Sequence, residues 1–180
     1  MVGAIVISLV ALLCCTGTIS GQSNASNQYK VKAAFLFHVA QFVEWPEGTF
    51  RDANSPLVYC TVGTDPFQGM LDASFQGKTI GAHTLQVKHF KEINEAQGCH
   101  VVFLGKPAKR KSIPNELASI KGSPVLTVGD TERFVDDSGM IGFCLEENKI
   151  GFEVNLDSAE KAHLKISAKL LALAKRVIVG

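Results

Sequence analysis

The first strongly patterned segment of the chain has apolar residues at helical spacing. Residues 29–46, YKVKAAFLFHVAQFVEWP, place apolar side chains at i, i+4, i+8, i+11 and i+12, which predicts an α-helix that ends before Pro46. Only a narrow polar stripe through Lys30, His38 and Gln41 remains, so we expect this helix to be buried between layers or covered by a partner. The predicted apolar face comprises Val31, Phe35, Val39, Phe42 and Val43.

Four further apolar or alternating runs predict β-strands. They are PLVYCTVG (56–63), HTLQVKHF (83–90), CHVVFLG (99–105) and SPVLTVGD (123–130). Short helices are expected between them, over residues 67–75 and 112–120. The run CHVVFLG is almost entirely apolar, as is usual for a strand that is covered on both faces of a parallel sheet.

The carboxyl-terminal segment combines a hairpin with helices. The run GMIGFCLEENKIGFEVNL (139–156) predicts two strands around a Glu-Asn-Lys turn, and Asn155 and Asp157 are expected to organise the exit into the next helix. Asp157 is expected to cap a short helix, and Ser167 a longer one that continues through Val177. The inward-facing hairpin positions are Ile141, Phe143, Ile150, Phe152 and Val154, and the apolar positions of the longer helix are Leu170, Leu171, Ala174 and Val177.

These elements predict one α/β domain over residues 27–178, a single layered domain with a mixed, mostly parallel β-sheet flanked by helices and a C-terminal β-hairpin plus helix. At 180 residues and 46% hydrophobic content, the chain is long enough for one well-buried core. Lys and Arg number 18 against 17 Asp and Glu, a net charge of +1 that argues against nucleic acid as a partner. We therefore interpret the basic run KPAKRK (106–111) as a solvated loop.

The amino terminus has the pattern of a signal peptide. Residues 1–15 carry no charge and small polar residues follow them, so we predict a signal peptide over residues 1–20, with cleavage after Ser20 or Ala25. The apolar run is shorter than the roughly 20 residues that span a bilayer, and no membrane span is expected after cleavage. Lipidation and a retained anchor are the alternatives. Such a signal peptide would direct export of the domain from the cytosol and would then be removed.

Familiar catalytic signatures are absent from the sequence. It contains no G-x-S-x-G, H-E-x-x-H, G-x-x-x-x-G-K or G-x-G-x-x-G motif, and its histidines show no metal-ligand spacing. Cys99 and His100 are neighbours on a predicted strand and point to opposite faces, which argues against a nucleophile–base pair. The acidic segment 130–137 lacks the spacing of a calcium loop, and we interpret it as a turn. The sequence therefore predicts a protein that is not an enzyme, with no cofactor and no metal site.

Export changes the expectation for the cysteines. Removal of the signal peptide leaves Cys60, Cys99 and Cys144, and thiols outside the cytosol tend to pair. Cys60 and Cys99 lie in or beside strands that can be neighbours in one sheet. They form either a disulfide, which an exported protein favours, or two buried thiols. Three is an odd number, so one cysteine is left over.

Several of these segments together resemble a known family. The runs KAAFLFHVAQFVEWP, CHVVFLG and GFCLEENKIGFEVNLDSAEKAHLKISAKLLALAKRV are similar to the YfiR/HmsC family of small periplasmic proteins, and the terminal block is the most specific. The resemblance implies a periplasmic regulatory protein. Such proteins bind the periplasmic sensory part of an inner-membrane diguanylate cyclase and repress it, which lowers cyclic di-GMP and biofilm formation. It also implies a homodimer.

The resemblance assigns roles to the cysteines. Cys60 and Cys99 fall where the family places its structural disulfide, and Cys144 falls at one partner of a second, redox-linked disulfide. The mate of Cys144 would lie within residues 134–141, where this sequence has no cysteine. The resemblance therefore leaves Cys144 as a buried thiol or as a bridge between two chains.

A repressor of this kind needs a surface for its partner. Apolar anchors on the first and last helices would dock a partner domain, and the alternative for each such residue is a place in the core. The candidates are Phe35, Val39, Phe42, Trp45, Leu170 and Leu173. The second functional hypothesis is a periplasmic ligand-binding or sensor-accessory module for a histidine kinase or a transporter.

Overall fold

A computed structural model describes residues 20–105, 113–147 and 149–180 of the chain. Its helices are α1 (Ser20–Val39), α2 (Met70–Phe75), α3 (Ile113–Ala118), α4 (Leu156–Lys161) and α5 (Ala168–Leu171), with 3-10 turns η1 (Ala40–Phe42) and η2 (Ile93–Glu95). Its strands are β1 (Val43–Glu44), β2 (Leu57–Val62), β3 (Thr79–Ile80), β4 (His83–Phe90), β5 (Val101–Leu104), β6 (Leu126–Gly129), β7 (Ile141–Glu146), β8 (Lys149–Asn155), β9 (Lys165–Ile166) and β10 (Arg176–Ile178).

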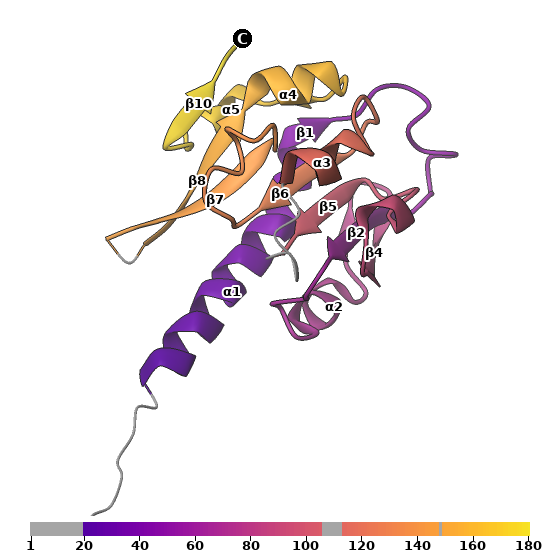
Figure 1. Cartoon of the computed structure of the whole chain (residues 1–180). Helices are drawn as coiled ribbons and strands as arrows, with labels where there is room; N and C mark the ends of the chain where they lie inside the picture. The colour runs from indigo at the N-terminus through magenta and orange to yellow at the C-terminus, as the bar shows by residue number, and fades with distance from the viewer. Residues whose placement is uncertain (1–19, 106–112, 148) are drawn as a thin grey trace, which may run out of the picture.

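The described strands form an eight-stranded sheet in the order β10-β8-β7-β6-β5-β2-β4-β3, and β1 pairs with β9 in a small second sheet. Neighbours in the large sheet are parallel, apart from the antiparallel pairs β7–β8 and β3–β4. The long helix α1 lies against this sheet, and its amino-terminal end projects away from the body of the domain (Figure 1). The predicted mixed, mostly parallel α/β fold is confirmed.

The central strands are buried on both faces, as their apolar composition predicts. Side chains alternate along each strand, so Tyr59 and Phe103 join the core on the face that α1 and α2 cover. Val58 and Val102 join a second cluster on the opposite face, which includes residues of α3 and η2. The sheet is therefore the middle of three layers.

The buried face of α1 differs in part from the predicted one. Val31 is 54% exposed, while Ala33 and Leu36 are buried among the core residues, so the predicted face was rotated about the helix axis. Lys30, His38 and Gln41 are exposed, which confirms the polar stripe. The regular helix also ends earlier than predicted, because η1 and β1 follow Val39.

The carboxyl terminus contradicts the predicted long helix. Ser167 caps α5 as predicted, its Oγ accepting a hydrogen bond from the Leu170 N–H, but α5 ends at Leu171. Val177 lies on β10, which pairs in parallel with β8. The N–H of Lys175 donates to the carbonyl of Phe152 at 2.8 Å, so backbone pairing with β8 replaces further helix.

The cap of α4 also differs from its prediction. The N-cap is Asn155, whose Oδ1 accepts a hydrogen bond of 2.9 Å from the Ser158 N–H, while Asp157 lies in the first turn and pairs with Lys161. The Asn155 Nδ2 donates to the Val135 carbonyl at 2.8 Å, which ties the helix start to the segment after β6. Asn155 therefore organises the exit from the hairpin, in agreement with the sequence.

Two predicted segments fall outside the described residues. They are the basic loop 106–111 and, apart from Ser20, the signal peptide. In the part of the chain that the structure describes, no helix combines the length and apolar character needed to cross a membrane.

Candidate functional site

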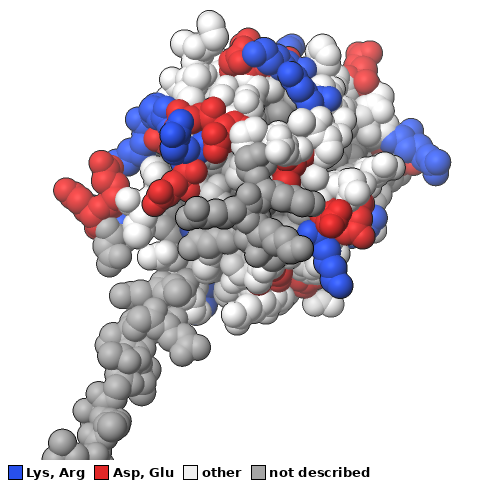
Figure 2. All heavy atoms as spheres, in the orientation of Figure 1, with Lys and Arg blue, Asp and Glu red and all other residues white. Residues whose placement is uncertain are grey.

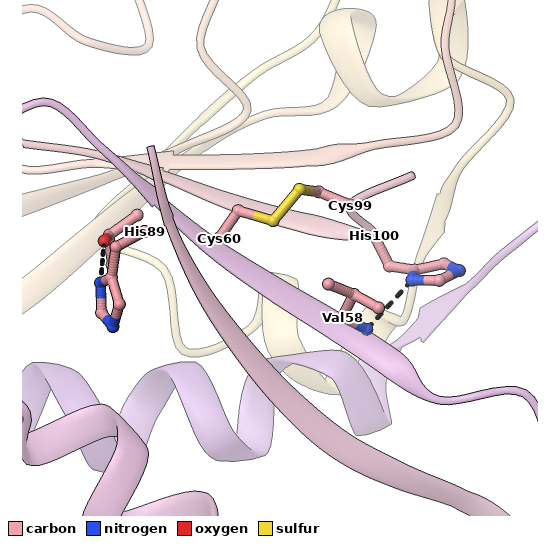
Figure 3. The surroundings of a disulfide bond; sticks show 6 residues. Val58, Cys60, His89, Cys99 and His100 are labelled. Carbon is pink, nitrogen blue, oxygen red and sulfur yellow. Dashed lines mark hydrogen bonds between the residues drawn. A yellow bond between two sulfur atoms is a disulfide. The ribbon is translucent and has the colours of Figure 1, made fainter. Parts of the chain in front are cut away.

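Cys60 and Cys99 form a disulfide between two neighbouring parallel strands. Cys60 lies on β2 and Cys99 just before β5, and their Cα atoms are 6.0 Å apart (Figure 3). Both residues are buried, at 1% and 4% exposure, within the core cluster on the α3 side of the sheet. The bond therefore fixes the centre of the sheet from inside and offers no sulfur to solvent or to a ligand.

The histidine beside this disulfide holds a loop. The Nδ1 of His100 accepts a hydrogen bond of 3.0 Å from the Val58 N–H (Figure 3). The ring of Phe50 stacks on His100 and, on its other side, on His83, with ring centroids 4.5 Å and 4.1 Å apart. Burial lowers the pKa of His100, and a backbone hydrogen bond to Thr49 opposes that shift. His100 thus holds the segment between β1 and β2 in place, and the neighbouring Cys99 is bound in the disulfide.

Cys144 is the free thiol among the described cysteines. It lies on β7 opposite Gly151 of β8 and is half-buried. Burial raises the pKa of the Cys144 thiol, and the nearby Glu153 and Glu146 carboxylates raise it further, while Lys175 lowers it. The thiol is therefore protonated at neutral pH and is a weak nucleophile.

The structure separates the six predicted partner-binding residues into different environments. Val39 and Leu170 are core residues, at 1% and 3% exposure, so neither offers its side chain to a partner. Phe35, Phe42 and Trp45 are half-buried and pack against the core. Leu173 is 69% exposed.

The edge strand β10 carries further exposed apolar side chains. Val177 is 36% exposed and Val179, one residue beyond the strand, is 68% exposed. Arg176, the first residue of β10, directly precedes Val177 and forms hydrogen bonds of 2.8–3.2 Å to both Asp136 and Glu153. This network lowers the pKa of Asp136, chiefly through the hydrogen bond from Arg176. The β10 edge thus combines exposed apolar side chains with a salt-bridge network that Arg176 forms with Asp136 and Glu153.

A buried ion pair lies at the carboxyl end of β6, where the sequence predicted only a turn. The Nζ of Lys32 on α1 is 3.0 Å from the Asp130 Oδ2, and the Tyr29 hydroxyl donates to the same oxygen at 2.8 Å. The side chains of Lys32 and Asp130 are 11% and 4% exposed. Burial and the bond to Asp130 raise the pKa of Tyr29, so it remains a neutral donor.

Sequence reasoning missed this pair, although each residue carried a signal. Lys32 is a charge outside the polar stripe of the helix, four residues before the buried Leu36. Asp130 follows an apolar parallel strand directly, and ligands of parallel sheets gather at the carboxyl ends of strands. The two residues are separated by 98 positions in the sequence, so local sequence patterns could not indicate that they form a pair.

Charged side chains are mixed on the surface. On the face drawn in Figure 2, Lys and Arg are interspersed with Asp and Glu. Among the described residues, no group of three or more His, Cys, Asp or Glu side chains is arranged to hold a metal ion. The polar groups described above form salt bridges and hydrogen bonds between neighbouring elements.

A family model matches most of the chain. The model of the YfiR/HmsC-like family, DUF4154, matches residues 29–175. The chain therefore belongs to the YfiR/HmsC-like family. The match extends from α1 to the residue before β10, so it includes the disulfide, Cys144 and the Lys32–Asp130 pair.

A solved structure shares the fold at low sequence identity, and a second one aligns less well. A conserved domain protein from Vibrio cholerae O1 biovar El Tor strain N16961 superposes with a TM-score of 0.57 at 9% identity, covering 83% of this chain and 60% of that one. An ABC domain in complex with L-Trp from Streptococcus pneumoniae gives a TM-score of 0.49 at 11% identity, covering 86% of this chain and 60% of that one. This chain thus spans about 60% of the length of both structures.

Proposed function

We propose that this protein is a periplasmic repressor that binds the periplasmic sensor region of a membrane diguanylate cyclase and thereby lowers cyclic di-GMP and biofilm formation. Membership of the YfiR/HmsC-like family over residues 29–175 carries the proposal. The family is one of periplasmic regulators, and the signal-peptide pattern of residues 1–20 supports export. The buried Cys60–Cys99 disulfide suits an oxidising compartment.

The docking surface is proposed at the carboxyl-terminal edge of the sheet. Val177 lies on the edge strand β10, Val179 directly follows it and Leu173 precedes it by three residues, and all three are exposed apolar side chains. An edge strand presents unpaired backbone groups that a partner segment can extend, and exposed apolar side chains add burial on docking. Of the residues predicted from the sequence, Leu173 is the one with a well-exposed apolar side chain at this edge.

Co-expression with a candidate cyclase tests the function. The full chain is produced in cells that carry a membrane diguanylate cyclase with a periplasmic sensor region. Cyclic di-GMP is measured by mass spectrometry. Binding of the chain to the isolated periplasmic domain of that cyclase is measured by pull-down. We expect the chain to lower cyclic di-GMP and to retain the domain. Unchanged cyclic di-GMP together with no retention would refute the proposal.

A matched pair of variants tests the surface. Leu173→Glu places a charge on the proposed interface, and Gln86→Glu places the same charge on an exposed position of β4 near the other edge of the sheet. Leu173→Glu is expected to abolish retention and repression, and Gln86→Glu to preserve both. Equal activity of the two variants would move the interface away from Leu173.

The homodimer remains part of the proposal. An exposed sheet edge can also pair with the same edge of a second copy. Size-exclusion chromatography with light scattering, applied to the wild type and to Leu173→Glu, separates a dimer that uses this edge from one that does not.

A periplasmic ligand-binding role is the second candidate, because the buried pair of Lys32 and Asp130 lies at a cleft.

A further inference from the structure

A cleft of about 600 Å³ lies between α1 and the β7–β8 hairpin, above the carboxyl end of β6. Tyr29 and Lys32 line it from α1, Asp130 and Thr131 from the segment after β6, and Phe143 and Ile150 from the hairpin. Its volume is within the range of about 300–1,000 Å³ that is typical of small-molecule sites. Its position at the end of a parallel strand is where α/β sheets bind ligands.

The floor of the cleft has unused hydrogen-bonding capacity. Lys32 and Tyr29 both donate to the Oδ2 of Asp130, and its Oδ1 has no partner among the described residues. The Thr131 Oγ1 is also buried and without a partner in the described part of the chain. A carboxylate oxygen only accepts hydrogen bonds, so what this floor lacks is a donor. Leaving such a group unpaired in a buried place costs about 1–3 kcal/mol.

The walls suit a cation that carries an apolar group. The Nζ of Lys32 lies 4.6 Å from the ring centroid of Tyr29 and 5.5 Å from that of Phe143, so these rings already accommodate one ammonium group. Leu145 and Ile150 extend the wall with apolar surface. The lining therefore combines aromatic faces, aliphatic surface and an unmet acceptor.

The charge of the lining points the same way. The charged lining side chains are one positive, Lys32, and two negative, Asp130 and Glu132, which leaves one net negative charge. An anionic ligand would add to that charge, and a monocation would cancel it. The two unpaired oxygens have almost no surface open to a water-sized group, so a head group reaches them only when a lining side chain shifts, and it has to be compact. A primary ammonium, with three N–H donors on one small atom, meets each requirement.

We propose that this cleft binds a small primary amine with an apolar body, its ammonium group donating to Asp130 Oδ1 and Thr131 Oγ1 and its body lying against Tyr29, Phe143 and Ile150. The site differs from the proposed cyclase-docking edge in residues and position. Amine binding can therefore be tested, and can fail, independently of cyclase repression.

A series of four compounds tests the ligand class by isothermal titration calorimetry with the purified protein. Phenethylamine is the probe. N-acetylphenethylamine removes the charge, the trimethylated ammonium removes the N–H donors, and 3-phenylpropionate reverses the charge. We expect binding of phenethylamine and at least about tenfold weaker binding of the other three, as for the loss of a charge-assisted hydrogen bond. No heat with phenethylamine at millimolar concentration, or equal affinity across the series, overturns the proposal.

Three variants test the residues. Asp130→Asn and Thr131→Val are expected to weaken phenethylamine binding about tenfold and severalfold, while Glu160→Gln, an exposed carboxylate on α4 away from the lining, leaves it unchanged. Asp130→Asn also breaks the pair with Lys32, so circular dichroism is recorded for each variant. If Asp130→Asn does not fold, Thr131→Val decides. Wild-type affinity in every folded cleft variant overturns the assignment.

Discussion

The imidazole Nδ1 of His100 accepts the backbone N–H of Val58 at 3.0 Å, across the junction between β5 and β2. A nitrogen that accepts a hydrogen bond has to be unprotonated, so the native state favours the neutral ring. The pKa of His100 is accordingly lower in the folded protein than its ordinary value of 6.5, with burial as the main cause. Protonation therefore favours the unfolded chain.

This relationship predicts an acid-sensitive fold. The unfolded state binds more protons below its histidine pKa of about 6.5, so stability is full above that pH and falls as the pH drops through the lower folded-state pKa. His83, which stacks on the other side of Phe50, adds charge repulsion to His100 when it is protonated. Urea unfolding between pH 8 and pH 5 is expected to show this loss.

His100→Asn tests the cause, because the amide oxygen can still accept the Val58 N–H but does not titrate. The variant loses ring stacking and is expected to be less stable at pH 8, with a flatter decline toward pH 5 than the wild type. His38→Asn, at an exposed position, serves as the control with an unchanged slope. Parallel declines in wild type and His100→Asn would assign the acid sensitivity to other groups.

The disulfide is expected to supply a large part of the stability. It closes a loop with a sequence separation of 39, which corresponds to about 4 kcal/mol in the chain-entropy model. We predict that Cys60→Ala combined with Cys99→Ala lowers the free energy of unfolding by about 2–5 kcal/mol. Because both sulfurs are buried, the native protein should resist a thiol reductant until denaturant is added. Mass spectrometry of the alkylated protein distinguishes the disulfide-bonded protein from the reduced one. Rapid reduction of the disulfide without denaturant would contradict this prediction.

Arg176 is predicted to hold β10 against the sheet. Its guanidinium group forms salt bridges to both Asp136 and Glu153. Arg176→Ala removes both salt bridges and should speed the amide hydrogen exchange of residues 175–178 severalfold. Lys169→Ala, at an exposed position of α5, is the control. The pKa of Asp136 is lowered by Arg176, so the tie is present above the ordinary pKa of 3.8 and is lost as the pH falls through the lower folded value. Exchange that is unaffected by the substitution would place the anchor elsewhere.

Cys144 is predicted to react slowly. Its pKa is raised by burial and by Glu153 and Glu146, so iodoacetamide should alkylate it more slowly at pH 8 than it alkylates free glutathione. Glu146→Gln removes one of these carboxylates and frees Lys175 from its 2.8 Å ion pair, and both effects should accelerate the reaction. A wild-type rate that equals or exceeds that of glutathione would show an activated thiol and reopen a redox role.

Local patterns predicted the centre of the fold well. Strand β4 coincides with the run HTLQVKHF, and the strand that carries Val102 is buried on both faces as expected. Which side chains of a strand are buried depends on the alternation of side chains between its two faces, and this alternation can be read directly from the sequence. The inward positions of the hairpin were also right for Ile141, Phe143, Phe152 and Val154, which are buried, while Ile150 is half-buried beside the cleft.

Two features required contacts between distant segments. The residues after Leu171 have helical spacing, but β8 offers them a free edge, and Glu153 and Asp136 offer Arg176 two carboxylates. These gains outweigh local helix propensity, which contributes less than about 1 kcal/mol per residue. The Lys32–Asp130 pair likewise forms only after α1 has packed across the end of β6, so neither residue discloses it alone.

The parallel pairing of β10 with β8 bears on how the chain matures. Strand β8 is completed at Asn155, but its outer neighbour comes from residues 176–178, so a growing chain exposes that edge until α4, β9 and α5 have been added. An unpaired edge recruits other strands and is a route to aggregation. A chain cut before Arg176 would keep most of its core and still lack the segment that shields it. The edge of β8 is therefore covered only once residues 176–178 have been made and have paired with it.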